Sequence, residues 1–230
     1  MPRKTFDREL RRLEDEMLAL ASMVENAIVE SVDTLKKRDM EGSRRLIDND
    51  HAINDKRFAI EADTLVAIAT QQPMASDLRR LAAVLLLATE LERIGDYAKG
   101  IAKINLLIGE EPLMKPLIDL PRMAEKVTEM LHRAMDTFVT RDVELARAIP
   151  AEDDEVDALY EQIYRELVTY IIADPRNIDQ ANLLLWAAHN LERTGDRVTN
   201  ICERAVFTVT GEMEEMNLEA WENGGIAGVF

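Results

Sequence analysis

The sequence Leu-Glu-Arg-x-Gly-Asp occurs twice in this chain, with the two copies one hundred positions apart. Each copy places a glutamate and an aspartate four residues apart, as Glu92 with Asp96 and Glu192 with Asp196. On a helix, this spacing puts both carboxylates on one face, about a turn apart. Like charges at that spacing cost a helix a few tenths of a kcal/mol, and an internal glycine costs about 1 kcal/mol more. The same cost appears in both copies, which indicates a function for these carboxylates.

Metal binding is the chemistry that these side chains suggest. In the second copy the same helix face continues with Asn200. A neighbouring helix offers Asp50 and Asn54 in the first copy, and Asp153 and Asp157 stand 103 positions later in the second. If the two helices of each copy run antiparallel, each site would gather about four oxygen ligands. Oxygen ligands suit hard or borderline cations such as Mg²⁺, Ca²⁺, Mn²⁺ or iron.

Two other interpretations of the carboxylates stay open. They could form a solvated helix face that is paired with Arg93 and Arg193 or with a neighbouring helix. His189 precedes Glu192 by three positions, a spacing found in carboxylate-bridged di-iron bundles, but Thr89 takes that place in the first copy. We therefore interpret the three histidines as structural or surface residues. The sequence has no nucleophile–base pair, phosphate-binding loop or Cys/His zinc pattern, so we predict no catalytic activity.

Long helices must position these side chains. Glycine and proline bound stretches that are rich in Ala, Leu, Glu, Arg and Met at helical period, and no stretch alternates long enough for a strand. The fold class is therefore all-α, with three helices of about 30 residues, or about 45 Å each. The six predicted helices are Thr5–Arg38, Met40–Thr70, Ser76–Ile108, Pro121–Thr140, Asp142–Ala173 and Asn177–Thr210.

The chain is a duplicated three-helix unit. From Leu85 to Ile101, eight of seventeen positions match the residue 100 further on, whereas upstream the offset is 103. We expect a shorter loop before the third helix of the second copy to account for the difference. The predicted organisation is two tandem three-helix bundles at 5–109 and 121–211, joined by a proline-rich linker at 110–120.

A flexible C-terminal tail is predicted at 212–230, where the sequence becomes first acidic and then glycine-rich. Trp221 and Phe230 are candidate docking anchors within it.

Composition narrows the partners and the location. Lysine and arginine number 28 against 44 acidic residues, so the formal charge is −16. This balance argues against nucleic acid or an anionic membrane surface as a main partner. The longest apolar run, Leu81–Ala88, has eight residues, far fewer than the ~20 that cross a bilayer. With no secretory signal pattern at the N-terminus and a single Cys202 on an apolar stripe, we predict a cytoplasmic protein with a buried thiol.

Three stretches resemble the PhoU family, namely "QQPMASDLRRL" at 71–81, "LERIGDYAKGIAK" at 91–103 and "LERTGDRVTNICE" at 191–203. The resemblance runs from about Leu10 to Gly211 and includes the duplication. It implies metal centres at the two Glu-x-x-x-Asp motifs, with Fe, Mn, Mg, Zn or Ca as the bound ion. It also implies a negative regulator of phosphate uptake and signalling that bridges the phosphate transporter ATPase and the phosphate-sensing histidine kinase. Such a protein would form a homodimer and meet the membrane only through its partners.

The two copies depart differently from the family pattern. Many family members carry asparagine four residues after the motif aspartate; the second copy has Asn200 there, but the first has Gly100. Lys103 also stands where the second copy has Glu203. We therefore expect the second site to bind metal more tightly than the first. A carboxylate-bridged metalloenzyme and a metal-free helical scaffold are the alternative functions.

Overall fold

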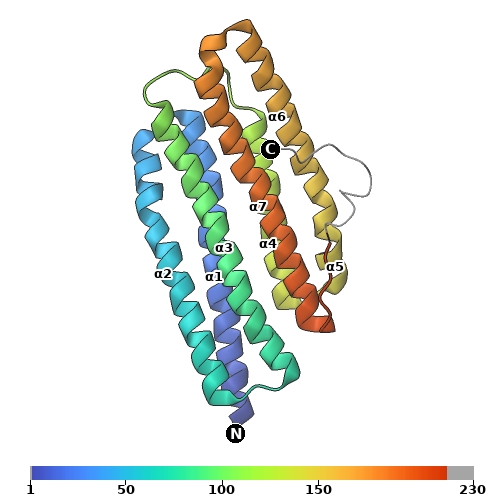
Figure 1. The fold of residues 1–230 in the computed structure, drawn as a ribbon. Helices are drawn as coiled ribbons and strands as arrows, with labels where there is room; N and C mark the ends of the chain where they lie inside the picture. The colour runs from blue at the N-terminus through green and yellow to red at the C-terminus, as the bar shows by residue number, and fades with distance from the viewer. Residues whose placement is uncertain (1, 217–230) are drawn as a thin grey trace.

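The computed structural model describes residues 2–216, and over that range it contains helices and no strand (Figure 1). The all-α fold class predicted from the sequence is confirmed. None of the helices in this range is long and apolar enough to span a membrane. The α-helices are α1 Pro2–Lys37, α2 Met40–Gln71, α3 Ala75–Ile108, α4 Asp119–Thr140, α5 Val143–Ala148, α6 Asp153–Ala173 and α7 Ile178–Thr210, with 3₁₀ helices η1 Ile149–Glu152 and η2 Pro175–Asn177.

The single helix predicted over Asp142–Ala173 is wrong, because the structure divides this stretch into α5, η1 and α6. Pro150 lies in η1, has no backbone N–H, and its ring would crowd the carbonyl group four residues earlier in an α-helix. A short 3₁₀ turn accommodates it. The counterpart of Pro150 in α2 is Ile47, so α2 runs unbroken. As a result Asp153 is the first residue of α6, whereas Asp50 lies inside a continuous helix.

Matching turns join the first and second helices of the two units. Arg38 and Arg141 have left-handed backbone conformations, with φ of 59° and 61°. Asp39 and Asp142 follow them, and each side chain accepts a hydrogen bond from the backbone N–H three residues later. Aspartate at this position caps a helix by satisfying one of its free N–H groups. The two turns are therefore built by the same local interactions.

The offset between matching residues of the two repeats changes from 103 to 100. This change arises within the third helix of each unit and not in the loop before it. Residues 72–74 connect α2 to α3, and residues 174–177 connect α6 to α7, so the second connection is not the shorter one. The predicted shorter loop is therefore wrong. α3 begins 16 residues before Leu91, whereas α7 begins 13 residues before Leu191. The third helix of the second unit thus starts three residues later.

The two units pack side by side (Figure 1). α1, α2 and α3 contact one another, as do α4, α6 and α7, and the units meet where α1 packs on α4 and α3 packs on α7. α3 and α7 run in opposite directions. One hydrophobic cluster extends through both units and includes Val24 and Leu91 together with Val127 and Leu191. The repeats therefore bury their apolar faces against a common interior, and separate domains at 5–109 and 121–211 stay a prediction.

The segments outside the repeats are held by specific contacts. In the connection between α3 and α4, buried Lys115 pairs with Glu166 of α6. After α7, Glu214 forms an ion pair of 2.7 Å with Arg147, and Met216 packs against the core. These contacts join Glu214 and Met216 to the helices, and the flexible tail at 212–230 stays a prediction. The rest of that tail, with Trp221 and Phe230, lies outside the described residues.

Candidate metal centres

Four carboxylates of the second unit lie close together between α6 and α7. Asp153 and Asp157 come from the first turns of α6, and Glu192 and Asp196 come from the middle of α7. The charges of Asp157, Asp196 and Glu192 all act on Asp153. The structure thus gathers the four acidic residues that the sequence predicted for the second site. We call them the second cluster.

Burial and mutual repulsion disfavour the charged forms of these groups. Burial, and then the charges of its three neighbours, raise the pKa of Asp153 to about 7. Burial, followed by Asp196 and Asp157, raises the pKa of Glu192 to about 7. Burial also raises the pKa values of Asp157 and Asp196. Carboxylates in such surroundings are stabilised by a proton or by a bound cation.

Gly195 allows the Asp153 carboxylate to lie directly against α7. A Cβ atom at position 195 would stand 2.1 Å from Asp153 Oδ1, so any larger residue there would have to push this carboxylate away. Asp153 Oδ1 is buried and has no hydrogen-bond partner. A buried, unpaired carboxylate oxygen is costly unless a cation or a donor meets it. The space left by the glycine and the unpaired oxygen together fit a bound cation.

The second cluster is not a preformed cage. Within residues 2–216, no group of three His, Cys, Asp or Glu side chains is arranged so that it could hold a metal ion as it stands. Asp157 and Asp196 lie at the edge of the second cluster, where solvent reaches part of each side chain. Asp153 Oδ1 is buried against α7. Ligation of a metal would therefore require the exposed carboxylates to turn toward Asp153.

His189 stands beside the second cluster. Its Nδ1 atom lies 3.1 Å from Glu192 Oε2, and the ring is flanked by Trp186 and Tyr160 at centroid distances of 5.6 and 6.3 Å. Burial lowers the pKa of His189, which favours the neutral ring that ligates metals. From its sequence context, His189 was interpreted as a structural or surface residue. Its three-residue spacing from Glu192 was the signal that pointed to the site.

Asn200 does not belong to the second cluster. Its side-chain amide donates a hydrogen bond of 3.4 Å to Glu90 of α3, and Arg197 pairs with the same glutamate at 3.3 Å. The matching position of α3, Gly100, faces α7 in turn, because a Cβ there would stand 3.0 Å from the side-chain nitrogen of Asn190. The difference between Asn200 and Gly100 therefore concerns the contact of α7 with α3. It gives no reason for the second site to bind metal more tightly.

The aspartates of the first unit face a lysine. Asp50 is buried, and its Oδ2 atom lies 2.6 Å from Lys99 Nζ. The same ammonium group is 3.6 Å from Asp96 Oδ1. Asn54 donates a further hydrogen bond of 3.2 Å to Asp50. The predicted residues of the first site are brought together, but around an ammonium group. We call Asp50, Glu92 and Asp96 the first cluster.

Glu92 faces an arginine. Arg57 NH1 lies 3.6 Å from Glu92 Oε1. Burial and then Asp96 raise the pKa of Glu92, and Arg57 acts against both. The motif glycine also has another neighbour here, because a Cβ at Gly95 would meet Ile53 Cδ1 at 3.2 Å and no carboxylate. The first cluster therefore has neither the unpaired oxygen nor the space that fits a cation in the second.

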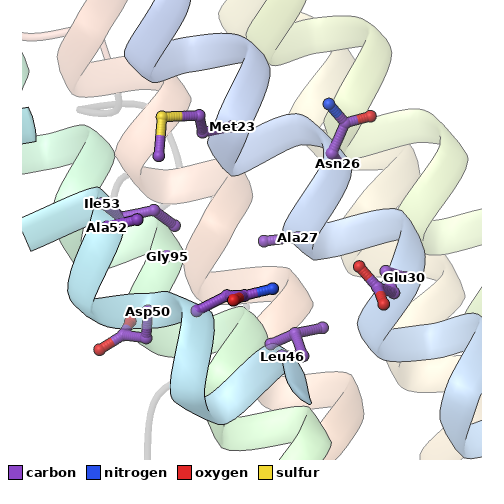
Figure 2. A pocket seen from close by; sticks show the side chains of 10 residues that line it. Met23, Asn26, Ala27, Glu30, Leu46, Asp50, Ala52, Ile53 and Gly95 are labelled. Carbon is purple, nitrogen blue, oxygen red and sulfur yellow. The ribbon is translucent and has the colours of Figure 1, made fainter. Parts of the chain in front are cut away.

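A groove between α1 and α2 lies beside the first cluster (Figure 2). Its volume is about 310 Å³, and its lining includes Met23, Glu30 and Asn49. Figure 2 shows the Asp50 carboxylate on the side of α2 away from α1. At the matching place in the second unit, Glu152 pairs with Lys126 at 2.9 Å and with Arg133 at 2.7 Å. The groove is thus open where the second unit carries ion pairs.

Comparison with known proteins places the chain in a family. The PhoU domain model matches residues 17–104 and again 120–205. The chain is 34% identical over 218 residues to the phosphate-specific transport system accessory protein PhoU homolog of Clostridium acetobutylicum, covering 94% of this chain and all of the relative. It is 36% identical over 214 residues to the homolog of Deinococcus radiodurans, covering 92% of this chain and all of that one.

A solved structure has the same fold. The crystal structure of the phosphate transport system regulatory protein PhoU from Streptococcus pneumoniae matches with a TM-score of 0.84 at 32% identity. The match covers 91% of this chain and 99% of that chain. The family domain occurs twice, in the two repeats described above, and this chain belongs to the PhoU family.

Proposed function

We propose that this protein is a cytoplasmic accessory component of a phosphate-specific transport system and that it acts by binding rather than by catalysis. The observation that carries the proposal is the match of both repeats, over nearly the whole chain, to relatives named as accessory proteins of that transport system. The site chemistry agrees with it, because carboxylates and a histidine that bind a cation can hold two helices or a partner surface in place. That role needs no bond-breaking step.

A divalent or trivalent metal ion at the second cluster is part of the proposal. Asp153, Asp157, Glu192 and Asp196 would supply oxygen ligands, and His189 would supply a nitrogen ligand. Carboxylates suit Mg²⁺, Ca²⁺, Mn²⁺ and iron, and an added imidazole favours Mn, Fe or Zn. The ion would supply positive charge that offsets the repulsion among the carboxylates. The chain's own residues then fix α6 against α7.

We propose that the protein bridges the transporter ATPase and the phosphate-sensing histidine kinase, and that it lowers uptake and signalling when phosphate is abundant. Regulation appears in the name of the protein from Streptococcus pneumoniae. The formal charge of −16 suits partners with basic docking faces. A homodimer belongs to the same proposal, and sedimentation velocity at several protein concentrations measures it.

A deletion strain tests the regulatory role. Without the gene, alkaline phosphatase is expected to be expressed in high phosphate, and the wild-type gene is expected to restore its repression. A gene with Glu192→Gln/Asp196→Asn is expected not to restore it, because those changes remove ligands of the second cluster. A strain that represses alkaline phosphatase normally after deletion would overturn the regulatory role.

Retention on membranes tests the partners and the metal together. Membranes that contain the transporter ATPase and the kinase are expected to retain the protein, and EDTA is expected to release it. Membranes that lack both partners are the control. Retention that EDTA does not change would favour the metal-free scaffold. Oxygen consumption by iron-loaded protein that is lost in Glu192→Gln would favour the carboxylate-bridged metalloenzyme.

A further inference from the structure

We infer that Lys99 and Arg57 are the resident cations of the first cluster, so that the first unit holds its carboxylates together without a metal ion. The two repeats would then use the same acidic motif with two different kinds of positive charge. The inference rests on the proposed function only where it compares the first cluster with the metal site proposed for the second.

Lys99 stands where a bridging cation would have to stand. Its Nζ atom lies 2.6 Å from Asp50 of α2 and 3.6 Å from Asp96 of α3, so it joins the two helices that carry the cluster. An ammonium group at 2.6 Å donates a charge-assisted hydrogen bond to the carboxylate. Asp50 is only 4% exposed, and a buried carboxylate of this kind needs a partner. A metal ion that ligated Asp50 Oδ2 would have to displace this ammonium group.

Arg57 provides the second positive charge. Its NH1 atom lies 3.6 Å from Glu92, and its Nε atom lies 2.8 Å from Glu61. The Arg57 side chain is 22% exposed and the Glu92 side chain is 17% exposed, so the pair is partly shielded from water. Each carboxylate of the first cluster therefore has a basic side chain within 3.6 Å.

The second unit has neither cation at the matching positions. Thr199 replaces Lys99 and Tyr160 replaces Arg57, at the offsets of 100 and 103 that relate the repeats. Burial and then the charge of Glu192 raise the pKa of the Tyr160 hydroxyl, so Tyr160 lies near Glu192 as Arg57 lies near Glu92. The Thr199 hydroxyl oxygen is buried and has no hydrogen-bond partner. Each cation of the first unit thus has an uncharged counterpart in the second.

The formal charges of the two clusters differ accordingly. In the first unit three carboxylates face two cations, which gives −3 + 2 = −1. In the second, four carboxylates have no cation at those two positions, which gives −4 when all four are ionised. Arg193 of α7 does approach the second cluster, but its nearest contact is 3.7 Å from Asp196, and its side chain is 41% exposed. With those carboxylates ionised, an added divalent ion is therefore attracted more strongly to the second cluster than to the first.

Titration with Mn²⁺ tests the inference on the full chain after dialysis against EDTA. Bound Mn²⁺ is followed by electron paramagnetic resonance and counted by elemental analysis. In the wild type, Glu92→Gln/Asp96→Asn is expected to leave bound Mn²⁺ unchanged, whereas Glu192→Gln/Asp196→Asn is expected to weaken binding by about tenfold or more. Loss of bound Mn²⁺ in the first of these variants would overturn the inference.

The second arm of the test replaces the two basic side chains of the first cluster. Arg57→Tyr/Lys99→Thr introduces the residue types found at 160 and 199, and it is expected to bind more Mn²⁺ than the wild type. Adding Asp50→Asn is expected to remove that gain. If circular dichroism shows that the double variant is less helical than the wild type, Lys99→Thr alone is titrated in its place. No gain in any folded variant without Lys99 would overturn the inference.

The two arms separate this inference from the proposed function. If the wild type binds no Mn²⁺ but the variants without Lys99 do, the metal site proposed for the second cluster fails and the role of Lys99 stands. If the wild type binds Mn²⁺ at the second cluster and those variants gain none, the proposed site stands and the inference about Lys99 fails.

Discussion

At the scale of single residues, the two motif glycines leave space for different neighbours. Gly195 gives room to the carboxylate of Asp153, and Gly95 gives room to the side chain of Ile53. The difference follows from the side chain at the matching position of the second helix, because Asp50 turns to Lys99 whereas Asp153 turns to α7. One glycine therefore shapes a charged site, and the other shapes apolar packing.

Replacing Gly195 by alanine is expected to displace the Asp153 carboxylate and to weaken Mn²⁺ binding by about tenfold or more. Alanine favours a helix over glycine by about 1 kcal/mol, so loss of helix stability would not explain that result. Mn²⁺ titration and urea unfolding measure the two effects. Gly95→Ala is the matched control, since its Cβ would meet only Ile53, and it is expected to leave Mn²⁺ binding unchanged. Equal losses of affinity in both variants would contradict this account.

The metal-free protein is expected to lose stability as pH rises through the range from about 4 to 7. The pKa values of Asp153 and Glu192 are raised from 3.8 and 4.5 to about 7 in the folded protein. The folded state therefore holds these protons more tightly than the unfolded chain, and the resulting stabilisation is complete at low pH and absent above pH 7.

Asp153→Asn/Glu192→Gln checks this dependence in EDTA. Its side chains stay neutral, so the variant is expected to melt above the wild type by roughly 3 °C or more at pH 8, and by less at pH 5. Thermal unfolding followed by circular dichroism gives both values. An increase that is the same at the two pH values would show that these carboxyl groups do not titrate as described.

At the scale of elements, the helix ends followed from local signals, but the break between α5 and α6 did not. The first helix was predicted to end at Arg38 and the second to start at Met40; in the structure α1 ends at Lys37, and the adjacent Asp39 caps α2. Apolar periodicity continues across Pro150, so the sequence suggested one helix over 142–173. The later start of α7 could not be predicted either. The change of offset between two repeats is the same whether a loop or a helix is shorter.

Asp142→Ala is expected to lower the free energy of unfolding by about 1 kcal/mol, since it removes the cap of α5. Asp142→Asn keeps an oxygen acceptor and is expected to cost much less. Asp39→Ala should have a similar cost at the start of α2, and the effects of the two alanine changes should add, because the caps are separate. Urea unfolding measures each variant. A cost for Asp142→Asn equal to that for Asp142→Ala would exclude the capping role.

At the scale of the whole molecule, the common interior is the feature that the sequence could not specify. The helical period of the apolar residues predicted helices that pack on neighbours, but such a pattern does not show which helices are those neighbours. The duplication predicted two similar units, and the structure adds that α3 lies on α7 and α1 on α4. The same limit explains Asn200, which was assigned to the metal site by its spacing but faces α3. The acidic pairs of α6 and α7 lie near one another because these helices are neighbours within one unit.

The two units are expected to unfold together, because one hydrophobic cluster spans both. Urea curves followed by far-ultraviolet circular dichroism, which reports all helices, and by fluorescence of Trp186, which lies in α7, should coincide. Trp186→Phe removes this signal and leaves only that of Trp221. Circular dichroism that shows two separate transitions would contradict the common interior.

The antiparallel contact of α3 with α7 also constrains how the two halves of the gene can diverge. Position 100 faces Asn190 and position 200 faces Glu90, so each half forms part of the other half's surroundings. A larger residue at 100 requires a smaller one at 190, and a substitution at 90 changes what position 200 can bond. Among relatives, these positions are therefore expected to covary across the repeats. At these contact positions, a change in one half is therefore expected to be matched by a change in the other.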